Sequence, residues 1–222
     1  AIVVEPLVQA AAGMLTHDVS FLRGVRALST EYGAYLLTDE VATGIGRTGT
    51  MWAVEQADIA PDLLTCGKGL TGGVLPLSAV LTTEEIYESF LGDASRTFFH
   101  GHSYTANPLC AAAALANLEL MDERGTVEHA AWIGRELGDL LKPFEADERV
   151  AEVRRIGTMT GIEVVPHGER TGFRICLAAR ERGVITRPLG DVVILMPPLG
   201  ITQPDLEQLV AAVRHGMDVV YA

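Results

Sequence analysis

The first part of the chain alternates short apolar runs with amphipathic stretches, which is the pattern of an α/β protein. Apolar runs predict strands over residues 2–4, 34–38, 63–66 and 77–82. Residues 19–32 carry apolar side chains at helical spacing, and a shorter helix is predicted over residues 84–91. Thr82 or Thr83 is the expected N-cap of the shorter helix.

The strongest helical pattern covers residues 107–121. It is rich in Ala and Leu, has Pro108 in its first turn and ends near Gly125. Beyond it, helices are predicted over residues 127–141, 172–182 and 203–220, and strands over residues 150–156, 161–165 and 192–196. We therefore expect two domains, an α/β domain over residues 1–123 and a smaller α+β domain over residues 124–222.

Composition narrows the class of protein. With 222 residues, 48% of them hydrophobic, the chain can bury a sizeable core. The excess of 29 acidic over 17 basic residues disfavours nucleic acid and anionic membranes as partners. No apolar stretch approaches the roughly 20 residues of a membrane-spanning helix.

Cysteine and histidine spacing gives no sign of a metal centre. Cys66, Cys110 and Cys176 are far apart and form no CxxC pair, so neither a disulfide framework nor a zinc site is expected. His100 and His102 have the spacing of a metal pair, but no further ligands cluster near them. We predict no metal and a location in the reducing cytoplasm.

Two polar motifs follow predicted strands. Asp39 and Glu40 end the strand in AYLLTDEVATGIGRTGT, and Lys68 ends the next strand in LLTCGKGLTGG, between Gly67 and Gly69. In open α/β sheets, ligands bind just beyond the carboxyl ends of strands. Glycines let the backbone turn sharply and approach a ligand closely. These residues are therefore the main candidates for a site.

Three other interpretations compete. A phosphate-binding P-loop requires Ser or Thr after its lysine, but Gly69 follows Lys68. The glycines of GIGRTG spell a dinucleotide-binding fingerprint, yet five residues, which include the acidic pair, separate Gly44 from the end of the strand, whereas a true fingerprint begins directly after its strand. A single charged residue at a strand end is most often a solvated surface group. Only the occurrence of Asp39 and Lys68 together, each in its own motif, favours a catalytic site over a solvated surface.

The context of these two motifs is a family resemblance. The segments EPLVQAAAGM, DEVATGIGRTG, CGKGLTGG, HGHSYTANP and TRPLGDVVILMPP occur in the order seen in class III aminotransferases, from Glu5 to Pro198. The resemblance implies a fold-type I pyridoxal-phosphate-dependent transferase, here as the C-terminal half of the large domain followed by the small C-terminal domain.

The resemblance implies a role for each matching residue. Lys68 would bind pyridoxal phosphate covalently and move the proton during transamination. Asp39 would pair with the pyridine nitrogen, which keeps the ring an electron sink. Val41 would pack against one face of the ring, or alternatively belong to the core.

Four further residues take their expected roles from the same resemblance. Ser103 aligns with a hydroxyl residue that binds the cofactor phosphate of the neighbouring subunit, which implies a homodimer. Arg187 would hold a substrate carboxylate. Glu5, expected at the cofactor site, pairs with that arginine in some members, and Arg47 would shape the substrate entrance.

Three of the motifs look closest to the branch that aminates 8-amino-7-oxononanoate in biotin synthesis, with S-adenosylmethionine, or in some relatives lysine, as donor. Rival interpretations are an ω-amino acid:pyruvate or ornithine-type transaminase, a nucleotide-binding module, and a non-catalytic interaction domain. The family's glycine- and serine-rich phosphate loop and its ring-stacking aromatic residue are not visible. We therefore expect a parent protein about twice as long, and a fragment that is poorly stable and inactive alone.

Overall fold

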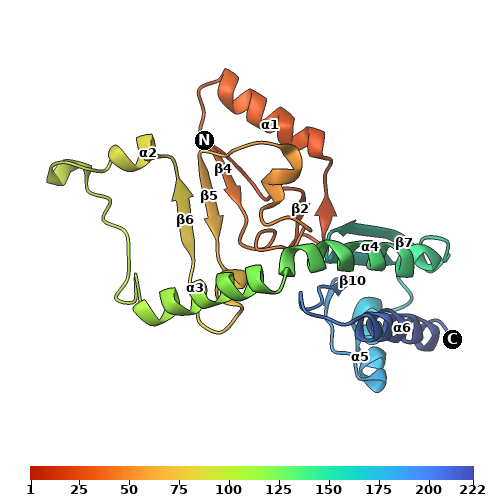
Figure 1. The fold of residues 1–222 in the computed structure, drawn as a ribbon. Helices are drawn as coiled ribbons and strands as arrows, with labels where there is room; N and C mark the ends of the chain where they lie inside the picture. The colour runs from red at the N-terminus through yellow and green to blue at the C-terminus, as the bar shows by residue number, and fades with distance from the viewer.

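The computed structural model describes residues 1–222, which form two four-stranded sheets and one two-stranded hairpin (Figure 1). The strands of the first sheet are, in spatial order, β1 (Ile2–Val4), β4 (Leu36–Asp39), β5 (Leu63–Cys66) and β6 (Ala79–Thr82). The first three are parallel and β6 is antiparallel to β5. The carboxyl ends of β4 and β5 therefore lie side by side.

The first sheet is packed mainly on one face. Leu36 and Thr38 on β4 are buried, and so are Leu64 and Cys66 on β5, because alternate residues of a strand point to the same face. Helix α1 (Val19–Glu31) adds Leu22 to the seven-residue core cluster of this region. The opposite face carries the intervening residues, which include the site residue Asp39.

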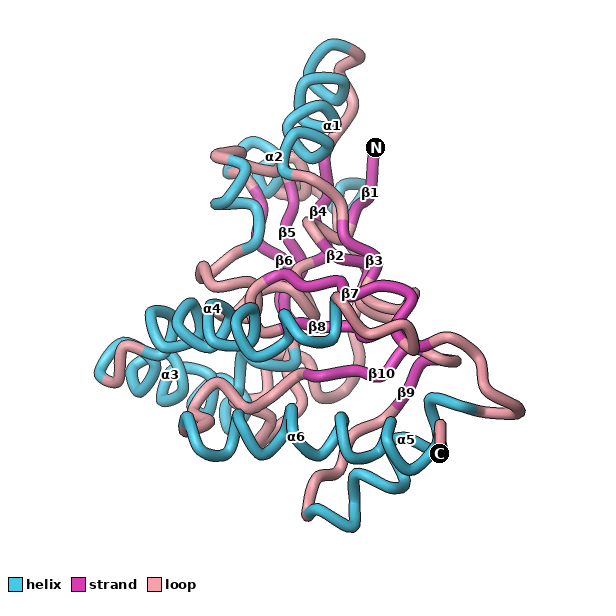
Figure 2. Tube along the Cα trace, turned by 90° about the vertical axis from the view of Figure 1, so that its right-hand side faces the viewer, coloured by secondary structure: helices cyan, strands magenta, loops and turns pink.

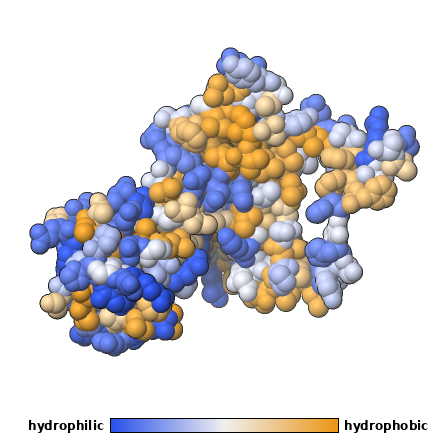
Figure 3. Space-filling model, turned by 180° about the vertical axis from the view of Figure 1, so that it is seen from behind, coloured by the Kyte–Doolittle hydropathy of each residue, from blue (hydrophilic) through white to orange (hydrophobic).

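Helix α1 corrects one detail of the sequence analysis. Its periodicity suggested a single apolar face, but Leu22 is fully buried while Phe21 and Leu28 are 52% and 50% exposed. Leu22 packs in the cluster that also holds Ala53, Val54 and Leu64, whereas Phe21 and Leu28 lie outside that cluster. Apolar side chains also gather over the part of the molecule that holds the first sheet, as seen from behind in Figure 3, and Val3, Val80 and Leu81 are among those exposed.

An extended segment links the first sheet to the long helices. After α2 (Glu84–Glu88), capped by Thr83, and a short 3-10 helix at Ala94–Arg96, residues up to 107 form neither helix nor strand. Figure 1 shows this segment reaching away from the rest of the molecule. Helix α3 (Pro108–Glu123) then begins at Asn107, whose side chain accepts a hydrogen bond from the Leu109 amide.

The second sheet is antiparallel throughout, with strands in the order β7 (Val150–Ile156), β8 (Met159–Val164), β10 (Val192–Leu195) and β9 (Pro188–Leu189). Helices α4 (Thr126–Glu145), α5 (Thr171–Ala179) and α6 (Gln203–Val220) enclose with it a core cluster of 14 buried residues. Figure 2 shows α5 and α6 running together below this sheet.

The hairpin β2 (Val8–Gln9) and β3 (Leu15–Thr16) joins the two sheets. Val8 and Met14 share a core cluster with Met159, Val192 and Ile194 of the second sheet. The sequence did not predict this hairpin, because strands of two residues carry too little periodicity to be recognised.

Most predicted elements are present, with ends shifted by a few residues. One shift has a clear physical reason: α4 was predicted to end at residue 141, but it continues past Pro143 to Glu145. Phe144 is 1% exposed in the core, and its burial offsets the backbone hydrogen bond that a proline removes. No helix has both the length and the apolar character needed to cross a lipid bilayer.

Candidate active site

Asp39 is held at the carboxyl end of β4, opposite Thr65 of β5. Its Oδ1 accepts hydrogen bonds from the Val41 amide, at 3.0 Å, and from the Thr65 hydroxyl, at 3.1 Å. Its Oδ2 has no hydrogen-bond partner in the chain. Two donors on one oxygen fix the orientation of the half-buried carboxylate and leave the other oxygen free to accept a charge-assisted hydrogen bond.

Lys68 begins a 3-10 helix, η2 (Lys68–Thr71), directly after β5. Its φ of 43° is rare for a residue with a side chain, and such strain is typical of functional sites. Asn117 on α3 supports the turn, since its side-chain amide donates to the carbonyls of Gly69 and Leu70. The Lys68 side chain makes no hydrogen bond or ion pair within the chain, so it is available to a ligand.

The glycine at position 69 packs closely against another loop. A Cβ placed there would lie 3.1 Å from the Cβ of Ile45, in the glycine-rich loop that follows Asp39 and Glu40. The turn after β5 and the loop after β4 are therefore in direct contact. This contact brings the two sequence motifs together at one edge of the first sheet.

A cavity of about 600 Å³ opens beside Lys68. Its wall includes Val41, Arg47 and Arg187, together with Arg180, which the sequence analysis did not select. Apolar residues from the hairpin and the second sheet complete the wall: Ala10, Ala11, Met14, Leu189, Ile194 and Met196. The cavity thus lies between the two sheets and has the size and partly apolar lining of a small-molecule site.

Asp39 and Glu5 open to a second hollow of about 500 Å³ rather than to this cavity. The Glu5 carboxylate accepts a hydrogen bond from the Ala10 amide, with Oε2 3.1 Å from the nitrogen. Glu5 and Arg187 form no ion pair, so the pairing that occurs in some members of the family is not present here. Their roles stay predictions.

Arg47 contacts the second sheet rather than standing free in the cavity. Its Nη1 donates to the Pro197 carbonyl oxygen at 2.6 Å, and its own carbonyl accepts from the amide and hydroxyl of Thr158. Burial lowers the pKa of the Arg47 guanidinium. Arg47 therefore ties the glycine-rich loop to the second sheet and shapes the cavity through that contact.

Glu40, the second acidic residue of the motif, is a fully buried anchor that the sequence analysis did not assign. Its carboxylate accepts hydrogen bonds from the Thr43 hydroxyl and from the amides of Ala53 and Val54. Burial raises the pKa of this carboxyl group despite these donors. Strand alternation was the available signal, since it places Glu40 on the opposite face from Asp39.

Ser103 lies outside both hollows, on the exposed segment before α3. His100 and His102 lie on the same segment, and no group of three or more His, Cys, Asp or Glu side chains is arranged to hold a metal ion. The structure therefore does not bring Ser103 to Lys68 within one chain. A contact with a second subunit stays a prediction.

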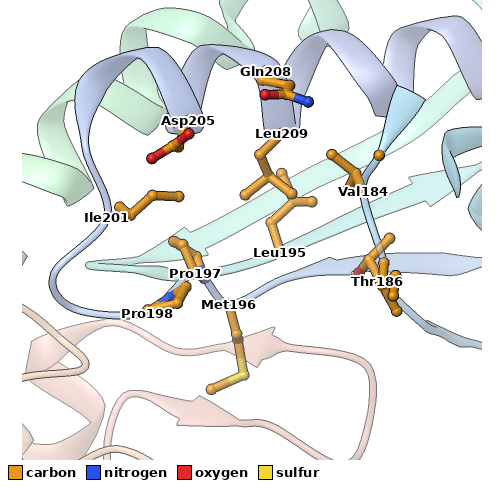
Figure 4. A pocket seen from close by; sticks show the side chains of 12 residues that line it. Val184, Thr186, Leu195, Met196, Pro197, Pro198, Ile201, Asp205, Gln208 and Leu209 are labelled. Carbon is orange, nitrogen blue, oxygen red and sulfur yellow. The ribbon is translucent and has the colours of Figure 1, made fainter.

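A smaller cavity of about 290 Å³ adjoins the main one and shares Ile185, Thr186 and Met196 with it. Figure 4 shows it between the start of α6 and the end of β10, with Asp205 and Gln208 on the helix side. The Asp205 carboxylate accepts a hydrogen bond from Thr202, the N-cap of α6. The other polar side chains of this cavity are engaged as well, since Gln208 donates to the Arg182 carbonyl and Thr186 donates to the Ile194 carbonyl.

Comparison with known proteins gives consistent matches over nearly the whole chain. The model of the family described as aminotransferase class-III matches residues 1–217. A relative from Nitratidesulfovibrio vulgaris, named adenosylmethionine-8-amino-7-oxononanoate aminotransferase, is 51% identical over 99% of this chain and 43% of its own length. The Aquifex aeolicus protein of the same name is 44% identical over 96% of this chain and 50% of its own length. The chain spans about half the length of these curated relatives.

Solved structures agree. The adenosylmethionine-8-amino-7-oxononanoate aminotransferase of Methanocaldococcus jannaschii superposes with a TM-score of 0.92 and 36% identity, over 99% of this chain and 54% of that one. An (S)-enantioselective omega-transaminase of Thermomicrobium roseum gives a TM-score of 0.94 and 35% identity, over 100% of this chain and 51% of that one. These neighbours confirm the fold class predicted from the sequence.

Proposed function

The chain belongs to the class III aminotransferase family, and on this premise we propose that the protein carrying it catalyses a pyridoxal-phosphate-dependent transamination. The observation that carries the proposal is the placement of an unpaired lysine and of a carboxylate held by two donors at the ends of adjacent parallel strands. Together these residues would supply both groups that the chemistry of the family requires.

The residues fit the cofactor. Pyridoxal phosphate supplies, when bound, an electron sink for the negative charge that develops at the substrate carbon. Lys68 would hold its aldehyde carbon through Nζ, and Asp39 would accept the ring N–H at Oδ2, the oxygen without a partner. Val41 lines the Lys68 cavity and donates its amide to Asp39, so its side chain would pack on the ring.

The other candidate residues take supporting roles. Once an incoming amine has displaced it, the Lys68 amine would move the proton at the substrate carbon. Arg187 lines the same cavity and would hold a substrate carboxylate with its planar guanidinium. Ser103 would bind the cofactor phosphate of a neighbouring subunit, which makes a homodimer part of the proposal. A cytoplasmic location is also part of it and is supported by three free, buried cysteines.

For the substrate, we propose that the amino group passes to 8-amino-7-oxononanoate and gives 7,8-diaminononanoate, a step of biotin synthesis, with S-adenosylmethionine as donor. Two curated relatives that carry this name support the proposal. An ω-transaminase is the second candidate, because a protein described as one has a closely similar structure. Product analysis with each donor, S-adenosylmethionine, lysine or an ω-amino acid, distinguishes the two.

The test of the cofactor uses the only two lysines of the chain, Lys68 and Lys142. In the full-length protein we expect added pyridoxal phosphate to produce a new absorption band at wavelengths beyond the protein's own absorption. Borohydride should fix the cofactor on Lys68 and not on Lys142. Lys68→Ala should abolish the band and lower the transamination rate by roughly 10²- to 10⁴-fold.

Lys142→Ala is the matched control, since this exposed lysine pairs only with Asp139 on α4, and its spectrum and rate should equal those of the wild type. Absence of the band in the wild-type protein would refute the aminotransferase proposal. A band that survives Lys68→Ala would refute only the assignment of Lys68.

A further inference from the structure

The cavity beside Lys68 differs in charge from the chain as a whole. Its wall has four basic residues, Arg47, Lys68, Arg180 and Arg187, and no acidic residue. The whole chain has 29 acidic and 17 basic residues, with a net charge of −12. A cationic pocket in an anionic protein concentrates the electrostatic potential at one place, which favours an anionic ligand there.

The three arginines of the wall are not equivalent. Arg47 is engaged with the Pro197 carbonyl. Arg180 and Arg187 are exposed, and neither guanidinium takes part in a hydrogen bond, an ion pair or a cation–π contact. Two unpaired guanidinium groups therefore remain on the wall, while Lys68 supplies the reacting amine.

The position of Arg180 supports a role in binding. It begins the short 3-10 helix η4 (Arg180–Arg182), which follows α5, and the chain then returns through Ile185 to Arg187, so both arginines flank one turn. The adjacent Glu181 forms no ion pair with either arginine, and its carboxylate lies 3.6 Å from the His215 ring on α6. The smaller cavity, which shares Ile185 with the Lys68 cavity, has an acidic residue, Asp205, as its one charged lining residue.

We propose that Arg180 is a second substrate-recognising residue, which acts with Arg187 to capture the carboxylate of the amino acceptor. This inference rests on the proposed function and names the substrate class of its cavity: an aliphatic keto acid whose carboxylate enters between two guanidinium groups while its chain contacts the apolar wall. Arg187 anchors the acid. Arg180 attracts it and excludes acceptors that lack a negative charge.

The test compares Arg180→Gln with Arg182→Gln in the full-length protein. Both changes remove one positive charge from η4, but Arg182 lies outside the cavity, with its Nη2 near the His215 ring. We expect Arg180→Gln to raise KM for the keto acid by about 3- to 10-fold with kcat unchanged. The decline of kcat/KM with added salt should become shallower, because a charge that attracts the acceptor has been removed. Arg182→Gln should match the wild type.

A binding experiment without turnover separates this inference from the proposed function. The probe is nonanoate, an aliphatic carboxylate, and nonanol is its uncharged counterpart. Calorimetry should give weaker nonanoate binding for Arg180→Gln and Arg187→Gln than for the wild type or Arg182→Gln, with nonanol binding equal in all four.

The outcomes are distinct. A wild-type protein that binds nonanoate in this pattern but transfers no amino group would contradict the proposed function and keep the anion site. Equal KM, salt dependence and nonanoate affinity in Arg180→Gln and Arg182→Gln would overturn the role of Arg180.

Discussion

The two sheets of this chain use their apolar residues differently. The second sheet and its three helices enclose a core cluster of 14 buried residues, whereas the cluster of the first sheet has seven. The first sheet also leaves apolar residues such as Val80 and Leu81 largely exposed. Yet Asp39 ends one strand of the first sheet, and Lys68 follows the neighbouring strand. The better packed region supports the cavity wall, and the less packed region carries the reactive groups.

This difference has a physical reason. The antiparallel second sheet has one face covered by helices and the other by the hairpin that precedes the site, so apolar side chains on both of its faces are buried. The first sheet presents the carboxyl ends of parallel strands, where backbone turns and polar side chains are accessible. Stability and chemistry are therefore separated between the two regions, and substitutions should affect them unequally.

The largest expected effect concerns the core of the second sheet. Leu137 on α4 is fully buried, and Leu137→Ala should lower the free energy of unfolding by about 2–5 kcal/mol through lost burial and a residual cavity. The control is Leu81→Ala on β6 of the first sheet. Because the Leu81 side chain is 49% exposed, this change should lower the free energy of unfolding by less than about 1 kcal/mol. Urea unfolding measures both. Equal losses would contradict the division of stability.

A second, intermediate effect concerns the junction of the regions. Gly157, in the turn between β7 and β8, has a φ of +55°, and a Cβ there would lie 2.6 Å from the Arg47 carbonyl oxygen. Gly190 has a similar φ of +60° and open space around it. Alanine at either position incurs the left-handed backbone cost of about 1–2 kcal/mol.

Only Gly157→Ala adds a clash with the glycine-rich loop, which should cost a further 1–3 kcal/mol or so in unfolding free energy. Because the clash displaces the loop that holds Arg47, KM for the substrate should also rise in this variant. Thermal melts and steady-state kinetics on the pair test this. If both glycine variants behave alike, the contact between the loop and the β7–β8 turn has no energetic importance.

The smallest expected effect depends on pH. Two hydrogen bonds from Arg149 to Asp147 lower the pKa of that carboxyl group from 3.8 to about 2. A carboxyl group with a lowered pKa in the folded state stabilises the protein above its unfolded-state pKa, and this stabilisation is lost as the pH falls toward 2. Wild type should therefore be more stable than Asp147→Asn at neutral pH, with the difference shrinking between about pH 4 and pH 2. Denaturant unfolding across this range measures it, and a constant difference would rule out the ionic contribution.

Local sequence signals predicted much of the architecture. The strands at residues 2–4 and 63–66 and the helix at residues 203–220 occur with the predicted bounds. Cap residues were equally informative: Thr83 begins α2, and Asn107 with Pro108 begins α3. The errors occur where the local signal is short or is overridden by packing, as in the β2–β3 hairpin and in the continuation of α4 past Pro143.

The candidate site divides in the same way. The sequence by itself determined the motifs, the positions of Asp39 and Lys68 at strand ends, and the family, because each depends on residue order over a few positions. Only the tertiary structure decided that Arg47 binds Pro197, 150 positions away, and that Arg180 joins Arg187 on one cavity wall. Such contacts depend on how two sheets pack against each other, and no local period or spacing encodes that arrangement.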